Sequence, residues 1–186
     1  MSRHLSQQLF KRAPLLAACV LATLVACDRA SKEASASTAD SAAPAKAAVA
    51  PMTVSLAQFQ QLRWLEGGWK GSGGGVDVFF EGYHWLNDST IRSFDYTDST
   101  LAVAKDSGEI NLRSGVVRSG SPDRSYVVTE LDSARALFSP ERTARNSFEW
   151  RHTGAGTWTA RLTWDSAGVP KERTYDMRAQ AYAKKH

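Results

Sequence analysis

Apolar residues recur along this chain with two different periods. Leu56, Phe59, Leu62 and Leu65 stand three residues apart, which predicts one short amphipathic helix after Ser55, a typical N-cap residue. Farther along, the period falls to about two, as it does in β-strands. The runs with this shorter period cover residues 76–81, 91–94, 110–112, 116–117, 126–128, 136–138, 148–151, 157–164 and 173–177.

Residues that favour turns separate these runs at regular intervals. They lie at positions 87–88, 106–108, 121–123, 154–156 and 167–168. Short strands with no helical pattern between them indicate an antiparallel meander, and closing the sheet removes its exposed edges. The predicted fold class is therefore all-β: an antiparallel up-and-down barrel of about 8–10 strands preceded by one short helix.

The N-terminus has the organisation of an export signal with a lipid anchor. Residues 1–12 are basic, and residues 13–26 are apolar but too few to span a bilayer, which needs about 20 residues. The sequence Leu24-Val25-Ala26-Cys27 resembles a bacterial lipobox, which predicts cleavage between Ala26 and Cys27 and acylation of the Cys27 thiol. Asp28 resembles an inner-membrane retention signal and thus favours the inner membrane as the site of attachment; the outer membrane is the alternative.

Other interpretations of this segment exist. Leu16-Ala17-Ala18-Cys19 also fits a lipobox, but it leaves a very short apolar core, and an ordinary secretory signal or an uncleaved helix is a further alternative. Residues 28–54 are rich in Ala, Ser and Lys and predict a disordered tether. The expected organisation is a signal peptide over 1–26, the lipidated Cys27 and its tether over 27–54, a barrel over 55–180 and a tail over 181–186.

Composition narrows the classes of function. Three of the 23 basic residues precede Cys27 and none of the 19 acidic residues does, so the formal charge falls from +4 to +1 after cleavage. A nearly neutral chain without a basic cluster does not predict nucleic-acid binding. Both cysteines lie at or before position 27, which leaves no disulfide, zinc knuckle or thiol nucleophile downstream.

The start of the predicted barrel carries a family resemblance. Residues 64–69 read Trp-Leu-Glu-Gly-Gly-Trp, and a helix followed by Gly67-x-Trp69 resembles the opening of calycins, the lipocalin-like barrels. The glycines of residues 67–75 also resemble nitrobindin-type barrels, and the closer similarity is to an uncharacterised family of bacterial lipocalin-like domains, often secreted. The resemblance implies that Trp69 packs at the closed end of the barrel under Arg178 from the last strand.

Candidate catalytic and metal-binding groups are sparse. Nitrobindins hold haem through a histidine near the C-terminus, but the last strand here carries Met177, so we expect no haem and no other cofactor. His84 and His152 lack the spacing of a metal site. The glycines of residues 71–75 lack a phosphate-loop ending, and no serine lies in a Gly-x-Ser-x-Gly motif. Three glutamates, Glu81, Glu130 and Glu149, fall on different strands, and we expect no catalytic or metal site.

A binding role is the first hypothesis. A membrane-anchored barrel of this size can hold one small hydrophobic or amphipathic ligand. The residues we expect around such a ligand are aromatic or charged and lie within the strand runs: Trp85, Arg92, Phe94, Arg118, Glu130 and Trp150. The alternative is a filled barrel that serves as a structural or interaction lipoprotein of the bacterial envelope, with an unknown protein partner, and a hydrolase or haem protein is the third hypothesis.

Overall fold

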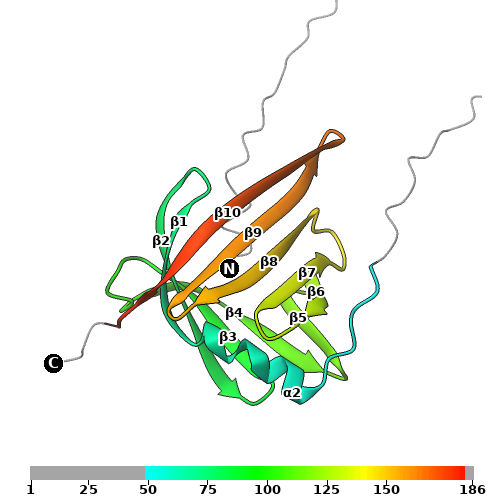
Figure 1. The fold of residues 1–186 in the computed structure, drawn as a ribbon, viewed down its shortest axis with the longest axis horizontal. Helices are drawn as coiled ribbons and strands as arrows, with labels where there is room; N and C mark the ends of the chain where they lie inside the picture. Colours follow the sequence, from blue (N-terminus) through cyan, green and yellow to red (C-terminus); the bar gives the residue numbers. More distant parts are fainter. Residues whose placement is uncertain (1–48, 183–186) are drawn as a thin grey trace, which may run out of the picture.

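The computed structural model describes residues 49–182, which form a closed antiparallel β-barrel preceded by a short helix (Figure 1). The helix α2 spans Leu56–Phe59 and continues as the 3-10 helix η1, Gln60–Leu65. The strands are β1 (Gly67–Gly73), β2 (Val76–Asn87), β3 (Thr90–Tyr96), β4 (Ala104–Arg113), β5 (Val116–Ser121), β6 (Arg124–Leu131), β7 (Arg135–Pro140), β8 (Asn146–Gly154), β9 (Thr157–Ser166) and β10 (Val169–Gln180). The predicted fold class is confirmed.

Each strand pairs with its neighbours in the sequence, and β1 closes the ring by pairing with β10. Ring closure leaves none of these ten strands with an unpaired edge, and unpaired edges are sites of aggregation. The predictions for the signal peptide, for Cys27 and for the tether up to residue 48 lie outside the described residues. The last strand, β10, ends at Gln180.

The helix begins where the sequence predicts. The Ser55 hydroxyl accepts a hydrogen bond from the Gln58 amide at 3.2 Å, and the Gln58 side chain accepts one from the Ser55 amide at 2.9 Å. This reciprocal capping box satisfies backbone donors that the first helical turn leaves free. Phe59, Leu62 and Leu65 are fully buried, so this amphipathic segment closes one end of the barrel. We call this end the helix end and the opposite end the mouth; in Figure 1 the β9–β10 hairpin extends past the mouth.

Two residues before the helix, Met52 and Val54, extend the hydrogen bonding of the barrel wall. The Met52 amide donates to the Val128 carbonyl at 2.9 Å, and the Val54 amide donates to the Gly115 carbonyl at 2.8 Å. These bonds connect the β4–β5 turn with β6, beyond the last paired residues of β5 and β6 at Arg118 and Val127. The folded unit therefore begins before residue 55, the boundary expected from the sequence.

One predicted turn is wrong. Residues 106–108 continue strand β4, and the connection from β3 runs through residues 97–103 instead. The register explains the composition: Gly108 is opposite Ser93, and the pairing shifts by one residue between Asp95 and Tyr96. A β-bulge beside small and acidic residues gives a strand the same composition as a turn. The other four predicted turns separate strands as expected.

Aromatic side chains fill the barrel from the helix end to its middle. Trp158, from β9, contacts Trp64, Tyr83 and Trp150 with ring centroids 5.8–6.0 Å apart. The contacts continue from Trp150 to Phe148 at 5.4 Å and from Phe148 to Tyr126 at 4.9 Å. Edge-to-face pairs of this kind add about 0.5–1.5 kcal/mol each to the free energy of burial. The interior is therefore a packed core over most of its length.

Candidate functional site

The helix end of the barrel is closed by a different cation–π pair from the one that the resemblance implied. Trp69 is buried and donates its indole N–H to the Leu65 carbonyl at 2.7 Å. Arg178 is exposed and pairs across the sheet with Lys70, so it lies on the face opposite Trp69. Expecting Arg178 to cover Trp69 is therefore wrong. Arg63, from η1, lies over the Trp85 ring at 4.5 Å instead.

Gly67 lies between the helix and β1, where the chain must turn sharply. Its φ of +126° is unfavourable for residues with a side chain, although a Cβ at this position would meet no atom within 4 Å. The glycine of the Gly67-x-Trp69 motif is thus required by its backbone conformation and not by a lack of space. It is the first residue of β1.

Two of the predicted ligand residues belong to the core. Trp150 is buried among Tyr83, Phe138, Phe148 and Trp158. Trp85 packs against Phe59 with ring centroids 5.2 Å apart, at the closed helix end. Both side chains are in the barrel interior, but their neighbours there are other core side chains.

The other predicted ligand residues lie on the outer face. Arg92 forms an ion pair with Glu109 at 2.8 Å, and the Arg118 guanidinium binds both oxygens of Glu141. Glu130 is exposed and pairs with Arg135. Phe94 packs against two other outer-face rings, His84 and Tyr96. The six predicted residues therefore do not form one site, because alternate residues of a strand face opposite sides of the sheet and the sequence does not reveal which face is inside.

The two internal histidines belong to different clusters. His84 lies on the outer face, where its Nε2 atom and the Tyr182 hydroxyl are 2.7 Å apart. His152 stacks on Trp64 at the helix end, with ring centroids 5.3 Å apart. Within residues 49–182 no group of three or more His, Cys, Asp or Glu side chains is placed to hold a metal ion.

A pair of acidic side chains is buried inside the barrel wall. Glu81 and Asp95 are directly opposite each other on β2 and β3, and each is only 2% exposed. The Tyr83 hydroxyl donates to Glu81 Oε2 at 2.6 Å, whereas Glu81 Oε1 has no hydrogen-bond partner. Burial and the nearby Asp95 charge raise the pKa of Glu81 well above its usual value. Glu81 is one of the three glutamates that the sequence places on different strands.

The mouth of the barrel contains a small pocket with a basic lining. Its volume is about 240 Å³, and it is lined by residues from the start of β6 and from the segment before β8: Arg124, Tyr126, Thr143, Ala144, Arg145 and Asn146. The Tyr126 hydroxyl donates to Asn146 Oδ1 at 3.0 Å. Burial is the main reason that the pKa of Tyr126 is raised to about 12, while the hydrogen bond with Asn146 and the Arg124 charge act against this rise.

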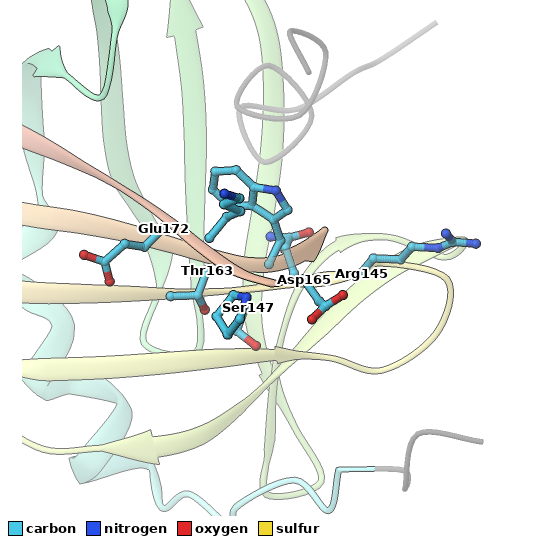
Figure 2. A pocket seen from close by; sticks show the side chains of 9 residues that line it. Arg145, Ser147, Thr163, Asp165 and Glu172 are labelled. Carbon is cyan, nitrogen blue, oxygen red and sulfur yellow. The ribbon is translucent and has the colours of Figure 1, made fainter. Parts of the chain in front are cut away.

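A larger pocket of about 450 Å³ lies next to it, along the ends of β8, β9 and β10. Arg145 and Asn146 line both pockets. Figure 2 shows Ser147, Thr163 and Asp165 close together, with Glu172 to one side and Arg145 to the other. Trp164 and Pro170 provide apolar surface, and Lys171 is the second basic residue in the lining. The volume is within the range of about 300–1,000 Å³ typical of small-molecule sites.

Sequence reasoning missed both pockets for an identifiable reason. Most of their residues lie in turns and at strand ends, and although Trp164 belongs to the predicted run 157–164, that run does not reveal which strand ends lie side by side. One signal was available: residues 142–146 read Arg-Thr-Ala-Arg-Asn, a polar segment directly before the apolar run at 148. A polar residue such as Asn146 at the start of an inward-facing row predicts a polar group in the interior.

The chain has no match among known protein families, characterised proteins or solved structures. No helix formed by residues 49–182 is long and apolar enough to cross a membrane. Function must therefore be inferred from the barrel and the two pockets at its mouth.

Proposed function

We propose that this protein is a lipid-anchored bacterial envelope protein whose lipocalin-like barrel binds a small hydrophobic or amphipathic ligand at its mouth. The observation that carries the proposal is the pair of adjoining pockets, of 450 and 240 Å³, in a closed barrel whose other end is sealed by a helix. Lipocalin-like barrels bind ligands at such an end because strand closure makes the scaffold rigid and leaves an opening for entry.

An inward-facing polar group near the mouth supports this location. Ser119 lies in a row that points into the barrel, opposite Tyr126 of the smaller pocket, and it is partly exposed. Its short side chain leaves more room than the large rings that fill the helix end.

The lipid anchor rests on the N-terminal sequence. Acylation of Cys27 with a diacylglycerol group would keep the protein on a membrane, because two acyl chains anchor stably whereas one binds only marginally. The barrel would then face the periplasm, and Asp28 favours the inner membrane. Cys27→Ser, expressed in the native bacterium and followed by cell fractionation, is expected to release the protein from the membrane fraction, with Cys19→Ser as the matched control. A Cys27→Ser protein that stays in the membrane fraction would refute the anchor.

A filled barrel with an interaction role is the second candidate. It is favoured by the unbroken series of aromatic contacts from Trp64 to Tyr126, which leaves the helix end solid. In that case the outer face or the rim would bind a protein partner. Neither candidate requires catalysis, and the site supports binding better than it supports a reaction.

Native mass spectrometry separates the two candidates. The full chain carrying Cys27→Ser, so that no acyl chain of its own competes, would be purified without detergent and sprayed under non-denaturing conditions. A co-purified small molecule that is lost in Trp164→Ala, but retained in a surface control such as Thr159→Ala, would support the binding role. A mass equal to that of the bare chain, together with no binding of added amphiphiles, would reject it in favour of the filled barrel.

A further inference from the structure

The charged residues that line the smaller mouth pocket are all cations. Two of its six lining residues, Arg124 and Arg145, are cations, and none is a carboxylate. Both arginines are exposed, and neither forms an ion pair with any residue of the described part of the chain. Among the other arginines, Arg118 and Arg135 bind glutamates, whereas Arg113 and Arg178 likewise form no ion pair within the described residues, so Arg124 and Arg145 are distinguished by lining one pocket together. Within residues 49–182, the pocket therefore brings together two positive charges that no carboxylate neutralises.

A buried donor at the same pocket also lacks a partner. Asn146 is 7% exposed, and its Oδ1 atom is occupied by the Tyr126 hydroxyl. Its Nδ2 atom is buried and has no hydrogen-bond partner. Leaving a buried amide donor without a partner costs about 1–3 kcal/mol, so proteins usually satisfy such groups or keep them for a ligand.

Nearby carboxylates are engaged elsewhere or lie outside the pocket. Glu141, at the start of the loop before β8, accepts hydrogen bonds from Arg118 and from the Ser125 hydroxyl. Asp123, next to Arg124, contributes its backbone carbonyl, which accepts the Thr143 hydroxyl. Neither side chain lines the pocket. Asp165, which lines the larger pocket together with Arg145, accepts the Gly168 amide at 2.7 Å and forms no ion pair with Arg145. The loop is thus fixed by its own contacts, and within the described residues the two guanidinium groups remain available.

We infer that the pocket formed by Arg124, Arg145 and Asn146 binds the anionic head group of the ligand, a phosphate or carboxylate group. Guanidinium groups recognise both anions through paired N–H donors, and an amide N–H can supply a further bond. The volume of about 240 Å³ suits a head group rather than a whole ligand. Trp164, in the adjoining larger pocket and in the inward-facing row of β9, is placed to contact the apolar part. This inference rests on the proposed function, since it names the ligand class for the same mouth.

Isothermal titration calorimetry on the full chain carrying Cys27→Ser tests the inference. The probes share one alkyl chain and differ in the head group: dodecyl phosphate and dodecanoate are anionic, dodecanol is neutral and dodecylammonium is cationic, all below their micelle concentrations. We expect the anionic probes to bind at least about tenfold more tightly than the neutral one, which corresponds to about 1.4 kcal/mol. The cationic probe is expected to bind most weakly.

Variants assign the preference to the pocket. Arg124→Gln with Arg145→Gln is expected to reduce affinity for dodecyl phosphate about tenfold or more, while affinity for dodecanol stays the same. Asn146→Asp keeps the size of the side chain but adds a negative charge, and it is expected to weaken anion binding as well. Arg142→Gln, an exposed arginine of the same loop that does not line the pocket, is the matched control and is expected to have no effect.

The outcomes distinguish the two proposals. If no probe binds, the proposed function fails together with this inference. If all head groups bind equally, or if the double arginine variant binds like the control, the anionic preference is wrong and the binding function stands. Inorganic phosphate, titrated alone, identifies the source of the anion: weak binding supports an amphiphile, and binding as tight as that of dodecyl phosphate supports a free anion and overturns the assignment to a head group.

Discussion

The buried carboxyl group of Glu81 should make the stability of this barrel fall as the pH rises. Its pKa is raised well above 4.5, first by burial and then by the Asp95 charge on the facing strand; the hydrogen bond from Tyr83 and the charge of Lys105 act in the opposite direction. The folded state therefore holds the Glu81 proton more tightly than the unfolded state does. Stability contributed by protonated Glu81 is present below about pH 4.5 and is lost as the pH rises toward the folded pKa.

The magnitude follows from linkage. One proton held by the folded state alone changes the free energy of unfolding by about 1.4 kcal/mol for each pH unit within that window. Glu81→Gln cannot ionise, so its stability relative to the unmutated chain should rise by up to this slope above pH 4.5. A constant cost of about 1–3 kcal/mol is expected at acid pH, because the new amide N–H₂ lies where Glu81 Oε1 has no partner. The slope, rather than the offset, tests the reasoning.

Urea unfolding monitored by tryptophan fluorescence between pH 4 and pH 8 measures this slope. The comparison uses the full chain carrying Cys27→Ser with and without Glu81→Gln. Tyr83→Phe is a second variant: it removes a hydrogen bond that lowers the pKa of Glu81, so it should extend the window to higher pH. A difference in stability between Glu81→Gln and its parent that stays flat over this range, or that turns against the variant as the pH rises, would refute the reasoning.

Two further predictions concern the arginines that bind Glu149 on the outer face and the crowded glycine Gly120 at the end of β5. Burial acts to raise the pKa of Glu149, but hydrogen bonds from Arg135 and Arg151 outweigh burial, so the pKa is lowered. The stability that ionised Glu149 contributes is therefore lost at acid pH. Glu149→Gln should be most destabilising near pH 7 and progressively less destabilising below about pH 4.5. Equal losses at pH 3 and pH 7 in the same urea series would contradict this. Gly120→Ala should lower the free energy of unfolding by about 1–3 kcal/mol more than Gly75→Ala, because a Cβ at Gly120 would clash with the Arg124 backbone oxygen. Both glycines have a positive φ, but a Cβ at Gly75 would meet no atom within 4 Å. Equal urea midpoints for these two variants would show that the crowding is relieved by backbone movement.

The arrangement of the strands could be predicted from the sequence because a barrel wall imposes a period of two on its residues. The change of period after Leu65 marks the end of the helix, and the turn residues at 154–156 and 167–168 mark two hairpins. The Ser55 cap was also predictable, since a serine followed three residues later by glutamine is a local signal.

The facing of individual strands could not be predicted in the same way. On β2 the apolar residues Val76 and Val78 suggest one inner row, yet Val78 is 47% exposed and Glu81, in the opposite row, is buried. The register that decides the inner row comes from pairing with β1 and β3, which depends on residues distant in sequence. For the same reason the arginines expected near a ligand, Arg92 and Arg118, lie on the outer face.

The mouth pockets depend on still longer-range information. Arg124 begins β6, whereas Asn146 begins β8, and they come together because two intervening connections place both strand ends at the mouth. Neither residue carries a periodic signal that would identify its role. A site built from strand ends becomes visible only after the topology is known.

The pairing between β1 and β10 affects how the chain can fold during its synthesis or export. Gly68 pairs with Gln180, more than a hundred positions away, so β1 lacks one of its two neighbours until β10 has been released. A chain emerging gradually from a ribosome or an export channel would therefore remain an open sheet until that strand is available to close it. Loss of β10 would leave the unpaired edges of β1 and β9 exposed, and unpaired strand edges promote aggregation.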